Sequence, residues 1–282
     1  LGAIGLVGPR GVRAAPPLFD PVGPIVPIRA LPDRLFRITV CLRPFREAGP
    51  RIATEQVGRK LVVHNYGHGG SGWSLSWGSA ALAVRKAVEA GGNRDIAVIG
   101  AGALGLTAAL TAQRAGIANV TIYARERFPD VRSARATGTW SPDSRVAMAG
   151  SVGPDFAAAW EQMTRLSFAT YQSYLGMPGT PVEWTDRYTL LPDTPAENVA
   201  AQAEAPERQF AEFGSRVRDL TPRSQELPPG SHPFATRFAR RNTSLTFNVS
   251  SLSHLLTDDF LAAGGKIEHA NFRTPADLAR LR

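Results

Sequence analysis

The clearest alternation of apolar and polar positions lies in the middle of this 282-residue chain. An apolar run, DIAVIG (95–100), predicts a buried strand, and the helical spacing of LTAALTAQRAG (106–116) follows a short glycine loop. A second apolar run, NVTIYARE (119–126), predicts another buried strand. Since strand, helix and strand in this order form a βαβ unit, we expect two parallel neighbouring strands with a right-handed crossover.

Weaker periodicity on either side of this unit predicts further elements. The expected strands lie at 35–43, 59–66, 182–192 and 236–249. The expected helices lie at 79–90, at 155–175 and from 250 to a glycine cap at 264–265, before a strand that ends near 272. The Pro-rich run 15–34 is expected to be extended over the surface, and 195–240 to hold loops and short helices.

The charge does not indicate a nucleic-acid partner. The formal net charge of +8 comes from arginines scattered along the chain, with lysine only at 60, 86 and 266. No basic run is interleaved with aromatic residues. A basic surface that favours anionic small molecules stays open. The single cysteine, Cys41, excludes an internal disulfide and a multi-cysteine metal site, and no apolar stretch is long enough to span a bilayer.

The two ends of the chain carry separate expectations. The run LGAIGLVG, with small residues at Val12 and Ala14, resembles the rear half of an export signal cleaved after Ala14; the alternative is an apolar N-terminal strand. An exported, periplasmic protein is therefore expected if 1–14 is a signal remnant, and a cytoplasmic one otherwise. The final RTPADLARLR has no closing element, so we expect the chain to be a fragment.

The glycine loop of the βαβ unit has the spacing of a dinucleotide fingerprint. Gly100, Gly102 and Gly105 give G-x-G-x-x-G directly after a strand and at a helix start, with Ala101 and Leu104 between them. These glycines permit a tight turn, approach of a pyrophosphate to the backbone, and close packing of helix on strand. The helix N-terminus adds free N–H groups for the phosphates. A glycine turn without a ligand is the alternative.

Two charged residues end the second strand of the unit. Glu126 lies about 20 residues beyond the fingerprint, where an acid can hold ribose hydroxyls. Arg125 precedes it and could instead bind the 2′-phosphate of NADP, and either residue could be a solvated charge.

Several segments together resemble the D-amino-acid oxidase family of FAD-dependent oxidoreductases. The glycine-rich HNYGHGGSGWSLSWGSA (64–80) resembles the signature that closes members of that family, and CLRPF (41–45) resembles the segment preceding it. The fingerprint, the loop GTWSP (138–142) and the segment 246–272 resemble the family's opening and central parts. Since the closing segment comes first here, the order resembles a circular permutation, and we expect the segment that supplies the family's active-site tyrosines to lie beyond Arg282.

The resemblance implies roles for individual residues. Arg43 would bind the substrate carboxylate, with a strand-edge salt bridge as the alternative, and the Gly70 carbonyl would meet the substrate amine. The positions that would line the flavin are Gly69, Gly70, Gly72, Trp73, Ser74, Gly138 and Trp140, the last with core packing as an equal alternative. His64 and His68 lie four residues apart, but the glycines between and after them exclude a regular helix, so no metal site is expected.

The sequence therefore predicts an α/β fold: a Rossmann-like FAD-binding domain of the three-layer ββα type with a partial α+β substrate domain. The predicted division is 1–14 signal remnant, 15–92 permuted FAD-domain segment, 93–150 βαβ unit, 151–240 substrate domain and 241–282 return to the FAD domain. The implied reaction is oxidation of an amino-acid C–N bond by hydride transfer to flavin N5, with O2 or another acceptor taking the electrons. The alternatives are another FAD-dependent amine or imino-acid dehydrogenase, an NADP-dependent dehydrogenase, and a non-catalytic flavin-binding fragment.

Overall fold

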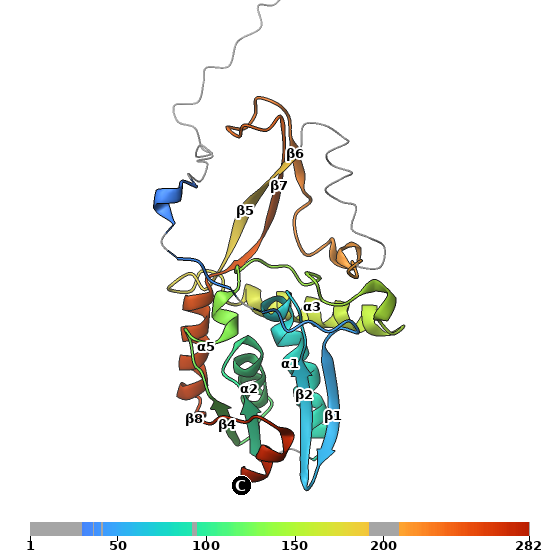
Figure 1. The fold of residues 1–282 in the computed structure, drawn as a ribbon, viewed down its shortest axis with the longest axis vertical. Helices are drawn as coiled ribbons and strands as arrows, with labels where there is room; N and C mark the ends of the chain where they lie inside the picture. The colour runs from blue at the N-terminus through green and yellow to red at the C-terminus, as the bar shows by residue number, and fades with distance from the viewer. Residues whose placement is uncertain (1–29, 36, 41, 92–94, 192–208, 282) are drawn as a thin grey trace, which may run out of the picture.

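A computed structural model describes residues 30–35, 37–40, 42–91, 95–191 and 209–281 (Figure 1). The expected export-signal remnant at 1–14 and most of the Pro-rich run 15–34 lie outside the described residues.

The lower part of the molecule is a parallel sheet covered by helices (Figure 1). Strands β3 (Asp95–Ile99), β4 (Asn119–Ala124) and β8 (Lys266–His269) lie in the order β3-β4-β8, and both pairings are parallel. Helix α2 (Ala103–Arg114) joins β3 to β4, and α5 (Val249–Ala262) leads into β8. The predicted βαβ unit is confirmed as a mixed α/β fold with a parallel sheet. The third layer of the ββα arrangement stays a prediction.

A hairpin and a long helix precede this unit and lie beside it. Strands β1 (Arg51–Val57) and β2 (Lys60–Tyr66) pair in antiparallel register, and α1 (Gly72–Glu89) follows. The sequence did not indicate β1. Helix α1 also begins well before the predicted start at Ser79, because the glycine-rich stretch continues directly into its first two turns, where Trp73 and Trp77 are buried.

A second, antiparallel sheet rises at the top of Figure 1. It contains β5 (Val182–Leu191), β7 (Phe238–Phe247) and the short β6 (Gln225–Leu227) in the order β5-β7-β6. Helix α3 (Phe156–Gln172) lies between this sheet and the lower body. The remaining described helices are short 3-10 turns: η1 (Pro32–Arg34), η2 (Arg132–Arg135), η3 (Ala149–Ser151), η5 (Gly214–Val217) and η6 (Pro275–Arg280).

The strand predicted at 35–43 is wrong for the described residues of that segment. Its alternating apolar side chains are strongly exposed: Ile38 is 77%, Val40 80% and Leu42 76% exposed. None of the described strands pairs with this segment, so its alternation has no sheet face against which to bury. An isolated bridge between Phe45 and His68 and the Arg46 guanidinium over the Tyr66 ring connect the following residues to the end of the hairpin.

Two apolar clusters hold the described elements together. The larger contains α1, α2, α5 and the parallel sheet, with Leu106, Ile122, Leu252 and Phe260 almost fully buried. The smaller joins α1 to α3 through Leu75, Trp160 and Met163. Leu166 of α3 lies away from this cluster and is 42% exposed. None of the helices in the described part of the chain combines the length and apolarity needed to cross a membrane.

Candidate functional site

A cavity of about 670 Å³ lies where the end of the hairpin, the start of α1 and the carboxyl ends of β3 and β4 meet. This is within the size range of small-molecule and cofactor sites. The structure brings almost all the sequence-predicted site residues into its wall: Arg43, Gly69, Gly70, Gly72, Trp73, Gly100, Ala101, Gly102, Leu104, Gly105, Arg125, Glu126 and Gly138.

The fingerprint loop has the close backbone packing that its glycines predict. Gly100 has φ +102°, a conformation that side chains rarely permit, and its N–H donates to the Tyr123 carbonyl at 2.8 Å. A Cβ atom at Gly105 would lie 1.8 Å from the Gly100 carbonyl oxygen. Only glycine at position 105 therefore lets α2 begin so close to β3, with its N-terminus facing the cavity wall.

Ser133 is a site residue that the sequence analysis missed. Its hydroxyl accepts the Ala103 N–H at 3.0 Å, and its carbonyl accepts the Trp73 indole N–H at 3.0 Å. A Cβ atom at Gly102 would approach the same hydroxyl to 3.0 Å. Ser133, in the short turn η2, thus connects the first turns of α1 and α2. A single serine in so short a turn carries no periodic signal that would have revealed this.

At the end of β4, the two candidate nucleotide-binding charges bind each other. Arg125 Nη2 lies 2.8 Å from Glu126 Oε1, and both side chains are exposed, at 61% and 41%. Both residues line the cavity. Because the pair is exposed, it contributes little to stability and can separate at little cost. Both charged groups can therefore reach a ligand in the cavity.

At the other wall of the cavity, Arg43 lies directly against Gly70. A Cβ atom at Gly70 would stand 2.3 Å from Arg43 Nη1 and 2.5 Å from the Ser144 carbonyl oxygen, so the guanidinium rests on bare backbone. The Gly70 N–H donates to that carbonyl at 2.9 Å, which fixes the backbone beneath Arg43. In the described part of the chain, Arg43 makes no ion pair with a carboxylate, so the salt-bridge alternative finds no partner there.

Two predicted flavin contacts lie outside this cavity. Trp140 is 8% exposed and packs edge-to-face on Phe168 and Tyr171 within the larger core cluster. The Ser74 hydroxyl is buried and accepts the Ser141 N–H at 2.9 Å. Trp140 also lines the larger hollow beside the antiparallel sheet, and the contact of both residues with flavin stays a prediction.

The two histidines of the glycine-rich stretch have different surroundings. His64 lies 2.8 Å from Glu55 across the hairpin. His68 is fully buried, and burial lowers the pKa of its imidazole to about 4, so the ring is neutral at pH 7. Among the described residues, no group of three or more histidine, cysteine or acidic side chains is placed to hold a metal ion.

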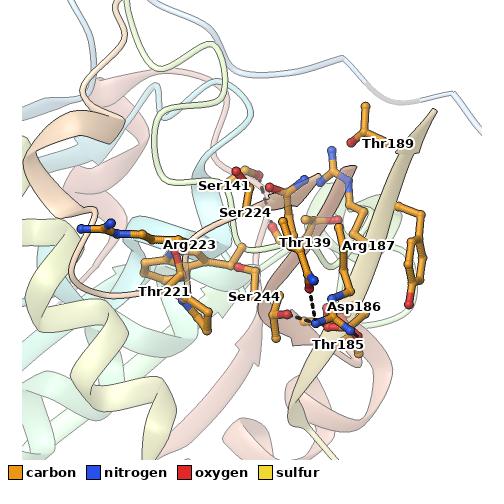
Figure 2. A pocket seen from close by; sticks show the side chains of 18 of the residues that line it. Thr139, Ser141, Thr185, Asp186, Arg187, Thr189, Thr221, Arg223, Ser224 and Ser244 are labelled. Carbon is orange, nitrogen blue, oxygen red and sulfur yellow. Dashed lines mark hydrogen bonds and ion pairs between the residues drawn. The ribbon is translucent and has the colours of Figure 1, made fainter. Parts of the chain in front are cut away.

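A larger hollow of about 2220 Å³ adjoins the cavity on the face of the antiparallel sheet. Thr139 lines both spaces and bridges to Thr246 of β7. Figure 2 shows its polar lining, which includes the hydroxyl groups of Thr185, Ser141 and Ser244 and the guanidinium group of Arg187. The hollow therefore offers hydroxyl and guanidinium groups, among apolar side chains such as Leu190 and Phe234, beside the wall that holds Gly138.

The residues of the cavity fit FAD. The fingerprint backbone is held where an added Cβ would collide with it, as a pyrophosphate-binding turn requires, and an acid stands at the end of the next strand. A second glycine segment, Gly69 and Gly70, lines the same space, and an added Cβ at either position would collide with the backbone of Arg145 or Ser144.

Comparison with known proteins identifies the family. The profile of the FAD dependent oxidoreductase family (DAO) matches residues 95–271, well over half of the chain. The chain therefore belongs to this family of FAD-dependent oxidoreductases.

Individual relatives match shorter or more distant parts. D-amino-acid oxidase of Dictyostelium discoideum is 52% identical over 50 residues, which is 17% of this chain and 14% of that protein. L-amino acid deaminase from Proteus vulgaris matches with a TM-score of 0.42 at 16% identity. The match covers 62% of this chain and 39% of the deaminase chain. Iminodiacetate oxidase from Chelativorans matches with a TM-score of 0.44 at 17% identity. The match covers 62% of this chain and 46% of the oxidase chain. The chain thus spans less than half the length of each of these proteins.

Proposed function

We propose that this chain provides the FAD site and the carboxylate-binding arginine of an enzyme that oxidises the C–N bond of an amino acid. The observation that carries the proposal is Arg43, which lies unpaired among the described residues on the bare backbone of Gly70. This arginine shares one cavity with the dinucleotide fingerprint.

Each wall of the cavity would perform one task. The backbone of Gly100–Gly105 and the N-terminus of α2 would hold the pyrophosphate, and Glu126 the ribose hydroxyls. Arg43 would bind the substrate carboxylate through two parallel charge-assisted hydrogen bonds, and the Gly70 carbonyl would accept from the substrate amine. The substrate side chain would extend past Thr139 into the larger hollow of Figure 2. If the amine enters neutral, positioning suffices and no side-chain base is required.

Bound FAD would supply the hydride acceptor for this oxidation, and O2 or another acceptor would take up the electrons, giving hydrogen peroxide in the case of O2. The imino acid product would hydrolyse in water to an oxo acid and ammonia.

We infer in addition that the family's segments are permuted in this chain. The support is spatial: the hairpin end around Gly69 and the fingerprint loop at Gly100 line one cavity although the first precedes the second in sequence. Permutation is cheap where the original ends lie close together at the surface.

The test is anaerobic reduction of the purified full-length protein. The expected protein is yellow from bound FAD and is bleached by an amino acid in a panel of D- and L-enantiomers that includes D-alanine. Peroxide formation on return to air indicates an oxidase, whereas reduction of a dye without peroxide indicates a dehydrogenase of the same family. A colourless protein that does not take up FAD, or a flavin that no amino acid bleaches, contradicts the proposal.

A further inference from the structure

Two polar side chains in the wall of the cavity are buried without hydrogen-bond partners among the described residues. Asn65, at the end of β2, has both amide atoms buried and unpaired. His68, three residues further on, has both ring nitrogens buried and unpaired. Both residues line the 670 Å³ cavity. Four unpaired polar atoms therefore gather in one short segment of the site.

Such groups point to a polar ligand. Buried polar atoms are almost always hydrogen-bonded, and an unpaired one destabilises the fold. An amide and a neutral imidazole each offer one kind of donor and one acceptor. A group that satisfies all four atoms must therefore present both hydrogen-bond donors and acceptors, which a carboxylate or a phosphate, with acceptors alone, does not.

The position of the pair narrows the choice of ligand group. His68 directly precedes Gly69 and Gly70, the bare backbone on which Arg43 lies, and Phe45, two residues after Arg43, bridges to His68. The pair therefore belongs to the wall with the carboxylate-binding arginine. Phosphate, which favours N–H groups and cations, is matched by the fingerprint wall instead.

We propose that Asn65 and His68 form a neutral hydrogen-bonding pair that recognises the pyrimidine edge of the flavin ring, where two carbonyl groups flank an N–H. This inference rests on the proposed binding of FAD. It makes both side chains positioning residues for the ring and gives the HNYGH part of the glycine-rich stretch a role beyond its glycines.

The experiment titrates FAD into the apo form of the full-length protein and three leucine variants, Asn65→Leu, His68→Leu and the double variant. Each single substitution is expected to weaken FAD binding by about fivefold to tenfold, as loss of one ligand hydrogen bond does. The near-ultraviolet flavin band, which responds to hydrogen bonds at the ring, is expected to shift in each. His68→Gln, which keeps a donor and an acceptor, is expected to recover part of the affinity.

The melting temperature of the apo form provides a second readout, which is expected not to fall in the variants although their FAD affinity falls. Leucine removes unpaired buried atoms, so the apo variants are expected to melt at the same temperature as the wild-type apo protein or higher. The matched control is His64→Leu, since His64 lies on the same strand but outside the cavity lining and pairs with Glu55; its FAD affinity is expected to be unchanged.

Two results would overturn the inference. The first is unchanged FAD affinity and spectrum in Asn65→Leu and His68→Leu. The second is equal destabilisation of apo and FAD-bound variants, as expected for residues that only support the fold. Failure of the wild-type protein itself to bind FAD would instead overturn the proposed function, so the two failures are distinguishable.

Discussion

Gly78 of α1 lies against the backbone of Met163 of α3. A Cβ atom at position 78 would stand 2.2 Å from the Met163 carbonyl oxygen and 2.3 Å from its Cα. The Gly78 N–H also donates to the Ser167 hydroxyl at 2.8 Å, so a side-chain oxygen of α3 reaches the main chain of α1. The two helices cross at backbone contact, and this contact fixes the helix whose first turn forms one wall of the cavity.

Gly78→Ala is therefore expected to destabilise the protein although alanine is the better helix former. The added methyl group meets backbone that cannot move aside, and overpacking of this kind costs about 1 to 3 kcal/mol. Urea unfolding followed by tryptophan fluorescence measures the loss. Gly150→Ala, where an added Cβ meets nothing within 4 Å, is the control and is expected to stay within about 0.5 kcal/mol of wild type. Equal stability of the two variants would contradict the contact.

Arg43→Ala is expected to leave FAD bound and to abolish most turnover of amino acids. Two charge-assisted hydrogen bonds to a carboxylate are lost, which predicts a decrease in kcat/KM of about a hundredfold or more. Arg43→Lys is expected to restore only part of it, because an ammonium group cannot make the paired geometry. Arg51→Ala, in an exposed pair with Glu55 on the hairpin, is the control. Wild-type turnover in Arg43→Ala would refute the assigned role.

The Arg125–Glu126 pair separates FAD from NADP. If Glu126 holds ribose hydroxyls, Glu126→Gln weakens FAD binding by about tenfold, since a charge-assisted hydrogen bond becomes a neutral one. Arg125→Gln is then expected to change FAD affinity less than threefold. Isothermal titration of both apo variants with FAD and with NADP measures the difference. A wild-type protein that binds NADP and loses this binding in Arg125→Gln, with little effect of Glu126→Gln, would favour the NADP-dependent alternative.

His68 predicts acid sensitivity of the apo protein. Burial lowers its pKa to about 4, whereas the unfolded chain protonates near 6.5, so only the unfolded state gains a proton between these values. Stability is therefore fully present above about pH 6.5 and falls as the pH decreases towards 4, by about 3 kcal/mol in total. Urea unfolding across this range, compared between wild type and His68→Leu, isolates the effect, because other groups titrate in both proteins. Parallel curves would show that His68 titrates normally in the folded state.

The predictable part of the fold is the part determined by local pattern. Strands β3 and β4 and helix α2 follow from one apolar run, one glycine loop and a second apolar run, and Gly105 occupies the position where backbone meets backbone. Arg43 and Gly70 could be assigned only through resemblance, because neither periodicity nor spacing distinguishes a substrate arginine from a surface one. Their contact in the structure is independent of that resemblance.

The remainder depends on partners distant in sequence. The alternation at 35–43 is strand-like, but a strand also needs a neighbour, and none of the described strands provides one. Ser133, Asn65 and His68 gain their importance from what surrounds them, which sequence spacing does not reveal. Helix α1 was predicted too short because glycines usually end helices, whereas Gly72 and Gly78 lie within this one, and Gly78 serves a tight crossing.

The order of the segments also affects how the protein is made. Trp73 and Trp77 of α1 are buried in the same cluster as Leu106 and Leu110 of α2 and Ile122 of β4, all of which are translated later. At ribosomal speed, the interval between Trp77 and the end of β4 lasts roughly 2 to 10 seconds. During that interval the aromatic face of α1 has no native cover, so its early synthesis is a direct cost of placing this segment first.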